Sequence, residues 1–469
     1  MPTEDDLPSV SLISLGCPKN LVDSERMLAG LALAGFALTP DADGADLAVV
    51  NTCGFIDLAR AESDEHIDRL EELKRAGRLG RIVVAGCMAQ RLGREVLARH
   101  PDVDAVVGLS GRDRVAEVCR NLLRRPSGKR RPGRRRQRRK DADGPPVWVG
   151  EAAGPVPMDR ERLRLTPRHY AYLRITEGCD NRCAYCAIPA IRGPLRSKPP
   201  DEVLAEAEEL TADGARELVL IGQDTTAYGR ETPEAGRSLA GLLARLREQV
   251  EVDWLRLMYA HPASLGPAVI EQLASGPPLA PYLDLPLQHA STALLGAMGR
   301  RVGREDIETL LADLRRAVPG IAVRTSFIVG FPGETEADVA DLVAFVREVA
   351  FDHVGAFVYS PETGTPASRL PDQVPREVAR ERLGRLMQAA GEVAREKAKQ
   401  RVGEHLTVLV DGADADGRVI TRHVGQAPEV DSAVLLSPGA AETGTFLTVR
   451  VTGTDGYDLT AEPDQDTRQ

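Results

Sequence analysis

Three of the chain's seven cysteines lie within the stretch CDNRCAYC, residues 179–186. Cys179, Cys183 and Cys186 follow a predicted strand with the spacing C-x3-C-x2-C. Three thiolates at this spacing can bind three corners of a four-iron cluster and leave the fourth iron without a protein ligand. An open metal position is typical of catalytic sites. A zinc knuckle or three buried thiols are the alternatives, but the loop offers zinc no fourth ligand, since His169 is ten residues upstream.

A second set of cysteines is spread over the N-terminal part of the chain. Cys17, Cys53 and Cys87 each end a predicted strand, in SLISLGC, AVVNTC and VVAGC. The carboxyl ends of parallel strands lie along one edge of a sheet, so we expect these three side chains to meet there. A glycine adjoins each of them, as expected where backbone approaches a bulky cofactor. Burial as a small hydrophobic side chain is the alternative, and we adopt it for Cys119 in VAEVCRNLL.

The elements that must position these cysteines are of α/β type. In residues 8–123, β-rich apolar runs alternate with helical stretches, which predicts a parallel sheet with right-handed crossovers. The expected strands are residues 9–16, 46–52, 81–86 and 104–109. Periodicity is lost in residues 124–157, which are predicted to form a flexible linker.

Periodicity resumes in residues 158–398, where six strand–helix units predict a complete or partial α/β barrel of the TIM type. The expected strands are residues 169–176, 217–222, 253–259, 281–287, 321–330 and 354–360. Residues 374–400 are predicted to form one long charged helix. In residues 399–466, short alternating strands and glycine turns predict a small antiparallel β-barrel of oligonucleotide-binding size.

Composition restricts the class of protein. With 469 residues, 42% hydrophobic and 28% charged, the chain is too long for one core and is neither wholly disordered nor a disulfide-stapled miniprotein. The start MPTEDDLP is acidic, and no uncharged stretch reaches about 18 residues, so neither a signal peptide nor a membrane span is expected. We expect a cytoplasmic protein whose cysteines do not form disulfides.

The cysteine loop within an α/β barrel resembles the radical S-adenosylmethionine superfamily. This resemblance implies that the open iron chelates the methionine moiety and that one electron from the cluster releases a 5′-deoxyadenosyl radical. Tyr185 is then expected to pack on the adenine, and Gln223 and Asp224 lie at a strand end that barrels use for ligands. Gly330 and Gly333, in FIVGFPGET, are expected to bind the same cofactor, unless this segment is only a tight β-to-α turn.

The motifs together are similar to those of the methylthiotransferase family, which joins an N-terminal three-cysteine domain, a radical S-adenosylmethionine core and a C-terminal TRAM β-barrel. The resemblance covers the chain except its first few residues and the linker. Its ribosomal-protein branch is matched by SLGCPKNLVDSE, NTCGFID, LTPRHYAYLRI, GQDTTAYG and QAPEVD. The resemblance implies a transferase that methylthiolates the β-carbon of an aspartate in the twelfth protein of the small ribosomal subunit.

The resemblance also implies the cofactors and partners. The cysteines of residues 179–186 would hold the radical-generating [4Fe-4S] cluster, and the three N-terminal cysteines an auxiliary [4Fe-4S] cluster that supplies or carries the sulfur. An unactivated C–H bond offers no proton to a side-chain base, which agrees with radical chemistry. The expected partners are the basic ribosomal protein, free or on the ribosome, and a flavodoxin- or ferredoxin-like electron donor. The chain is expected to be a monomer.

Two other functions compete with this one: a methylthiotransferase acting on a modified adenosine of transfer RNA, and a non-catalytic RNA-binding assembly factor. Residues 402–469 contain twelve Asp/Glu against four Arg, which would repel a polyanion and attract a Lys/Arg-rich protein, although such acidity also aids solubility. Residues 124–140 contain eleven Lys/Arg and no acid. This run is predicted to be a solvated linker, with contact to ribosomal RNA as the alternative.

Overall fold

The computed structural model describes residues 7–124, 144–152, 154–232 and 237–464. The chain forms two compact units. Unit 1 comprises Met1–Leu165 and Ala187–Pro194, and unit 2 comprises Thr166–Cys186 and Leu195–Gln469. The eight residues after the cysteine loop therefore fold with the N-terminal unit, and the predicted core and C-terminal barrel share one unit.

Unit 1 is built on a six-stranded, wholly parallel sheet in the order β2-β1-β3-β4-β5-β6. Its strands are β1 Ser9–Ser14, β2 Ala37–Leu38, β3 Leu47–Thr52, β4 Arg81–Gly86, β5 Ala105–Val107 and β6 Val147–Trp148. Its helices are α1 Pro18–Leu33, α2 Asp57–Arg75, α3 Cys87–Leu92, α4 Glu95–Arg99, α5 Val115–Arg124 and α6 Ile188–Arg192. The expected parallel sheet is confirmed.

Helices cover both faces of this sheet. Every residue of β3 is buried, as expected for a strand between two helical layers. One face packs on α1 and α5, and the other on Ile67 and Leu70 of α2. Cys119 is fully buried in the core between the sheet and helices α1 and α5, which confirms its assignment to packing. The strand order reverses between β1 and β3, and such a switch point is where open α/β sheets bind ligands.

The linker predicted for residues 124–157 extends too far toward the C-terminus, because part of this range forms a strand. Val147 and Trp148 form β6, which pairs with Val106 and Val107 of β5. A two-residue strand carries no detectable alternation, so periodicity could not reveal it. Residues 125–143, which hold nearly all of the basic run, lie outside the described residues.

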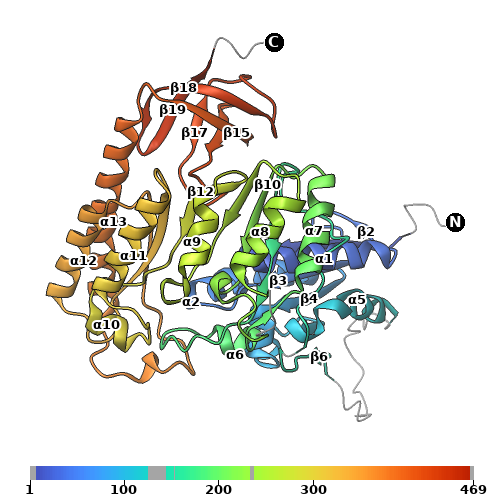
Figure 1. Cartoon of the computed structure of the whole chain (residues 1–469). Coiled ribbons are helices and arrows are strands. Elements are labelled where there is room, and N and C mark those ends of the chain that lie inside the picture. The colour runs from blue at the N-terminus through green and yellow to red at the C-terminus, as the bar shows by residue number, and fades with distance from the viewer. Residues whose placement is uncertain (1–6, 125–143, 153, 233–236, 465–469) are drawn as a thin grey trace. The chain divides into compact units, whose positions relative to one another are not determined.

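The larger sheet belongs to unit 2 and is also parallel, in the order β14-β13-β12-β11-β10-β7. Its strands are β7 Tyr170–Arg174, β10 Glu217–Ile221, β11 Trp254–Leu257, β12 Leu279–Asp284, β13 Ala322–Val329 and β14 His353–Val358, and a small ladder pairs β8 Thr176–Glu177 with β9 Arg196–Ser197. Its helices are α7 Pro200–Ala212, α8 Leu239–Gln249, α9 Pro267–Ala274, α10 Thr292–Ala297, α11 Arg304–Ala317, α12 Glu336–Val349 and α13 Arg376–Gln400 (Figure 1). The sheet does not close, so the barrel is a partial one of six strands.

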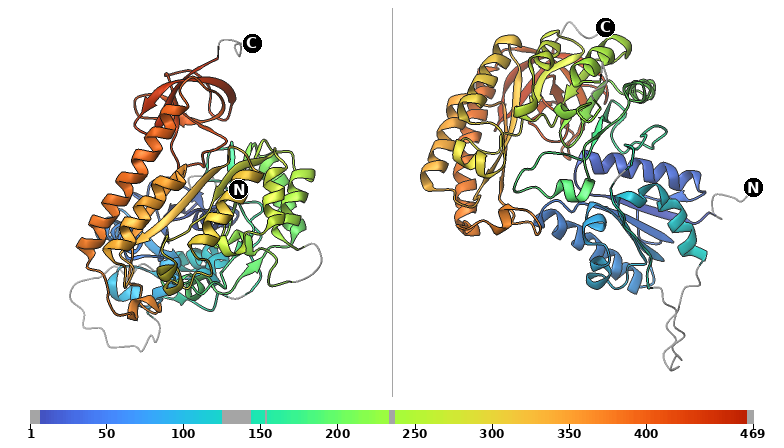
Figure 2. Two further views of the ribbon diagram at one scale, coloured as in Figure 1. Left: turned by 60° about the vertical axis from the view of Figure 1, so that its left-hand side comes forward. Right: turned by 60° about the horizontal axis from the view of Figure 1, so that its bottom comes forward.

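Helix α13, the predicted long helix, leads directly into a small closed barrel (Figure 2, left). Its strands, in the order β15-β16-β17-β19-β18, are β15 His405–Ala413, β16 Val419–His423, β17 Val434–Leu436, β18 Phe446–Asp455 and β19 Asp458–Pro463. The sequence predicted a purely antiparallel barrel. One pairing differs from this prediction, because β17 pairs with β19 in parallel. β17 is only three residues long, and the sequence pattern did not reveal it.

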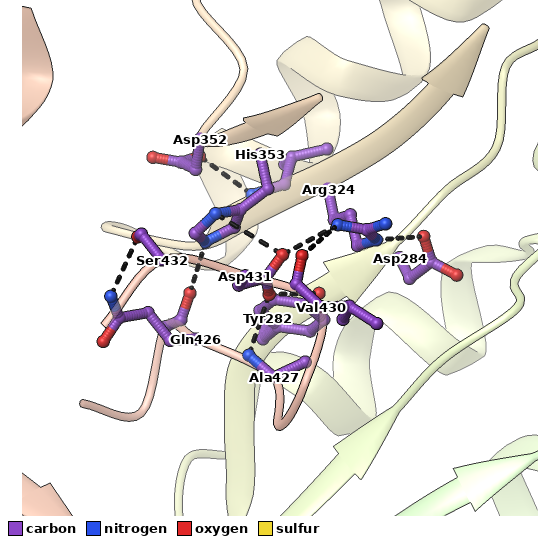
Figure 3. A network of polar contacts seen from close by, with 12 residues as sticks. Tyr282, Asp284, Arg324, Asp352, His353, Gln426, Ala427, Val430, Asp431 and Ser432 are labelled. Carbon is purple, nitrogen blue, oxygen red and sulfur yellow. Dashed lines mark hydrogen bonds and ion pairs between the residues drawn. The ribbon is translucent and has the colours of Figure 1, made fainter. Parts of the chain in front are cut away.

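The C-terminal barrel is attached to the larger sheet by a polar loop that follows β16, at residues 424–431. Asp431 accepts hydrogen bonds from the Tyr282 hydroxyl at 2.8 Å and from Arg324 Nη1 at 2.8 Å (Figure 3). Glu429 accepts hydrogen bonds from the hydroxyls of Tyr170 and Tyr172 at 2.8 and 3.1 Å. Tyr170 and Arg324 lie within the first three residues of their strands, so this loop covers the amino-terminal side of the sheet and leaves the carboxyl ends to the cysteine loop.

Two buried histidines make unit 2 sensitive to acid. Burial lowers the pKa of His261 to about 3, and burial together with nearby cations also holds the pKa of His423 well below its usual value. The unfolded chain takes up these protons below about pH 6.5 and the folded chain does not, so stability falls with falling pH in this range. Each histidine is expected to contribute up to about 1.4 kcal/mol per pH unit. Urea unfolding at about pH 7 and about pH 5 measures this slope.

The variant His261→Gln is expected to reduce this pH dependence. An unaltered slope in His261→Gln would show that the histidine is protonated within the folded protein.

Within the described residues, none of the helices is both long and apolar enough to cross a membrane.

Candidate functional site

The structure brings Cys17, Cys53 and Cys87 together at the carboxyl edge of the unit 1 sheet, each directly after or one loop beyond a strand. Cys17 and Cys53 flank the switch point between β1 and β3, and Cys87 begins α3 after β4. The charges of Cys17 and Cys53 are among those that raise the pKa of Cys87, which places the three sulfur atoms within mutual electrostatic range. The three side chains therefore lie at the sheet edge where the predicted strand ends placed them.

The glycines beside these cysteines allow a close approach of one loop to another. A Cβ atom on Gly16 would lie 2.7 Å from Cys53 Cβ, and one on Gly86 would lie 2.3 Å from Asn51 Oδ1. Both glycines have positive φ, at 89° and 92°. A Cβ atom on Gly54 would lie 2.7 Å from the Met88 backbone. The glycines therefore let the three cysteine loops approach one another.

Two asparagines hold the loops in this arrangement. The Asn20 side chain donates to the carbonyl oxygens of Leu15 at 2.6 Å and Asn51 at 3.1 Å. The Asn51 side chain in turn donates to the Asn20 carbonyl oxygen and to Ser24 Oγ, both at 2.8 Å. Both asparagines are buried, so these bonds are costly to lose and fix Cys17 relative to the strand that leads to Cys53.

The three thiols differ in acidity. Burial raises the pKa of Cys87 to about 12 and also raises the pKa of Cys53. Burial acts in the same direction on Cys17, but the Lys19 and Arg192 charges and backbone N–H groups at the start of α1 outweigh it, so the pKa of Cys17 is lowered. Cys17 is thus the thiol of this set that gives up its proton most readily, and the surrounding cations favour bound thiolates.

Arg192 is a member of this site that sequence reasoning missed. Its Nη2 donates to Cys87 Sγ at 3.3 Å and to Asp23 Oδ2 at 3.2 Å. Arg112 binds the other oxygen of Asp23 at 3.0 Å. Arg192 stands in the segment that follows the second cysteine motif, and only its folding into unit 1 places it beside Cys87, so no local pattern could have revealed it.

The other three cysteines lie in unit 2, after strands β7 and β8 at the carboxyl edge of the larger sheet. The loop is held by the Ala184 N–H, which donates to the Met298 carbonyl oxygen at 2.8 Å, and by Arg300 Nη1, 3.9 Å from Cys183 Sγ. Burial raises the pKa of Cys179 to about 11. Cys179, Cys183 and Cys186 are each partly exposed.

The five residues predicted to bind a cofactor divide into two groups. Both polar atoms of the Gln223 side chain are buried and have no hydrogen-bond partner among the residues that the structure describes. A buried amide without partners is costly, and a ligand that pairs with it would remove this cost. Tyr185 packs beside the apolar cluster that contains Ala184 and Phe331, and its phenol, which burial keeps protonated by raising its pKa, lies by Cys183.

The remaining predicted residues are engaged within the chain. Asp224 accepts hydrogen bonds from Asn181 at 2.7 Å and from Thr226 at 2.5 Å, so it ties the cysteine loop to the end of β10. The Gly330 N–H donates to both oxygens of Glu334 at 2.9 Å, and a Cβ atom on Gly330 would lie 2.4 Å from Ala379 Cβ. The Gly333 N–H donates to the Asp372 carbonyl oxygen. These contacts hold the tight turn that follows β13.

Three family models match parts of the chain. Residues 9–108 match the uncharacterized protein family UPF0004, residues 173–346 the radical SAM superfamily, and residues 402–463 the TRAM domain. A protein of Trichlorobacter lovleyi is 42% identical over 455 residues, which cover 97% of each chain, and it is named ribosomal protein uS12 methylthiotransferase RimO. The chain belongs to the uS12 methylthiotransferase family.

Further members of the uS12 methylthiotransferase family agree. The protein of Anaeromyxobacter sp. Fw109-5 is 44% identical and is covered to 92%, and that of Geobacter sulfurreducens is 41% identical and is covered to 98%. In both cases the match spans at least 96% of this chain. The radical SAM match implies one [4Fe-4S] cluster and S-adenosylmethionine for this family member.

Among solved structures, a radical S-adenosylmethionine methyltransferase, TsrM of Kitasatospora setae, superposes with a TM-score of 0.52 at 15% identity and covers 87% of this chain and 79% of its own. At this identity the likeness concerns the fold alone. It agrees with a partial α/β barrel in the uS12 methylthiotransferase chain.

Proposed function

We propose that this chain transfers a methylthio group to the β-carbon of an aspartate in ribosomal protein uS12. The observation that carries the proposal is the convergence of Cys17, Cys53 and Cys87 at one sheet edge in a chain whose second unit presents a separate three-cysteine loop. One radical-generating site alone would not explain the first set. The curated relatives that match nearly the whole chain are named for this activity.

The two cysteine sets fit two [4Fe-4S] clusters by their donor chemistry. Each offers three thiols and leaves one iron without a protein ligand. In unit 2, a bound cluster and S-adenosylmethionine would supply radical chemistry at an unactivated carbon, and in unit 1 a second cluster would supply the site at which sulfur is presented. We assign Cys179, Cys183 and Cys186 to the first and Cys17, Cys53 and Cys87 to the second.

The chain's own residues orient and enclose these groups. Asn181 and Asp224 hold the 179–186 loop against β10, and the orphaned amide of Gln223 is available to polar groups of S-adenosylmethionine. Tyr185 offers a ring face at the same end of the sheet for the adenine. In unit 1, Asn20 and Asn51 fix the loops that carry the thiols, and the start of α1 presents backbone N–H groups to Cys17.

The proposed partners follow from charge and redox chemistry. Residues 402–469, with twelve Asp/Glu against four Arg, favour a basic ribosomal protein over a nucleic acid. The one-electron reduction of the clusters calls for a flavodoxin- or ferredoxin-like donor. We further propose that the enzyme is a cytoplasmic monomer.

Product analysis tests this function. Reconstituted enzyme, S-adenosylmethionine and dithionite are incubated anaerobically with purified uS12, with small ribosomal subunits or with transfer RNA. We expect 5′-deoxyadenosine and a mass increase of one methylthio group replacing one hydrogen on uS12, in the free or the ribosomal arm. The same modification on transfer RNA alone would contradict the proposal. Absence of 5′-deoxyadenosine in every arm would indicate a non-catalytic binding protein.

A further inference from the structure

Arg192 occupies an unusual position for a residue that follows the 179–186 loop by only six places. It is 1% exposed, and its guanidinium lies against Cys87 Sγ at 3.3 Å. A buried guanidinium stays protonated, because the pKa of arginine is far above neutral. A full positive charge is therefore held in contact with one of the three N-terminal cysteines.

The position of Arg192 is determined by packing as well as by charge. Ala187 and Ile191, on the same turn of chain, lie in one small apolar cluster with Cys87 and Leu109. After Arg192 the backbone turns at Gly193, where φ is 78° and a Cβ atom would lie 2.2 Å from the Ala152 carbonyl oxygen. The segment 187–194 is thus held tightly within unit 1 and carries Arg192 beside Cys87.

Asp23 orients the guanidinium through the same nitrogen, Nη2, that contacts Cys87. This carboxylate is fully buried, and its two oxygens bind Arg192 and Arg112 at 3.2 and 3.0 Å. Of these two arginines, Arg192 contacts Cys87 Sγ at 3.3 Å, and Arg112 binds the other oxygen of the carboxylate. The chain therefore contains two buried arginines on one carboxylate, of which one faces the cysteines.

We propose that Arg192 is a positioning residue that holds a fixed positive charge against the sulfur ligands of the auxiliary site and thereby raises the reduction potential of the cluster bound there. The inference rests on the proposed auxiliary cluster. Reduction adds one electron and no proton, so the reduced form carries one more negative charge than the oxidised form. A cation within a few ångströms, in surroundings of low dielectric constant, stabilises the reduced form more.

The test uses the full chain with Cys179, Cys183 and Cys186 replaced by alanine, so that only the auxiliary cluster is reconstituted. Dithionite titration, followed by electron paramagnetic resonance, gives the potential of this parent and of its Arg192→Met, Arg192→Lys and Arg112→Met derivatives. We expect Arg192→Met to lower the ratio of reduced to oxidised cluster at a given potential at least about tenfold, or about 59 mV for one electron. Arg192→Lys, which retains the charge, should restore most of this loss.

Arg112→Met is the matched control, since it removes the other arginine from Asp23 and should leave the potential nearly unchanged. Equal shifts in Arg112→Met and Arg192→Met would overturn the proposal in favour of a packing effect, as would an unchanged potential in Arg192→Met. If Arg192→Met binds no iron, Arg192→Lys decides: a potential like that of the parent supports the proposal, and a tenfold loss contradicts it. A parent that itself binds no iron would refute the auxiliary cluster and this inference together.

Discussion

Replacing Cys17 by alanine is expected to abolish methylthio transfer to uS12 while 5′-deoxyadenosine continues to form. Cys17 lies in unit 1, at the sheet edge that it shares with Cys53 and Cys87, whereas the proposed radical-generating loop is held by contacts within unit 2. Loss of one of three thiolates removes a cluster ligand and should reduce the iron content from about eight to about four per chain. Iron content, 5′-deoxyadenosine and the mass of uS12 are measured on the same preparation.

The controls for this prediction come from the other cysteines. Cys183→Ala should abolish both products, because it removes a ligand from the radical-generating site. Cys119→Ala changes a cysteine that is buried in the core of unit 1, away from the sheet edge, and should retain both products and the full iron content. Loss of 5′-deoxyadenosine in Cys17→Ala, with the 179–186 cluster still present, would contradict two separate tasks for the two sets of cysteines.

The approach of Cys17, Cys53 and Cys87 could be predicted from the sequence because it depends on a general property of parallel sheets. Each cysteine follows a run of apolar residues long enough to be recognised as a strand, and strand ends on one edge lie together. The pattern did not give the reason for the neighbouring glycines. That reason is the contact of loop with loop, such as Gly54 against Met88, and it depends on atoms that are far apart in the sequence.

Features that depend on long-range placement could not be predicted. Arg192 reaches Cys87 only because residues 187–194 fold with unit 1. The hydrogen bonds that Asp431 and Glu429 accept from Tyr282 and Tyr170 join residues more than a hundred positions apart. Short strands such as β6 and β17 carry too few residues for an alternation to be recognised. These features link elements whose types were predictable.

The attachment of the C-terminal barrel depends strongly on Glu217, at the start of β10. Its carboxylate is fully buried and lies 2.6 Å from Arg256 Nε and 2.8 Å from Arg422 Nη1. Arg422 comes from the barrel strand β16 and also binds Asp411, and Arg256 donates to the Val424 carbonyl oxygen. Glu217 of the larger sheet and Asp411 of the barrel thus together balance the charges of Arg256 and Arg422.

The variant Glu217→Gln is expected to lower the free energy of unfolding of unit 2 by about 3–5 kcal/mol, because it takes the carboxylate from the buried Arg256 and leaves Arg422 paired with Asp411 alone. Trp254 reports the loss, since its ring lies 4.8 Å from that of Phe446 in the C-terminal barrel. The chain has two tryptophans, so Trp148→Phe makes Trp254 the single fluorescent reporter for urea unfolding. Glu392→Gln, in an exposed ion pair with Arg347, is the matched control and should leave the transition unchanged. Equal midpoints for the two variants would show that the buried carboxylate does not hold the barrel on the sheet.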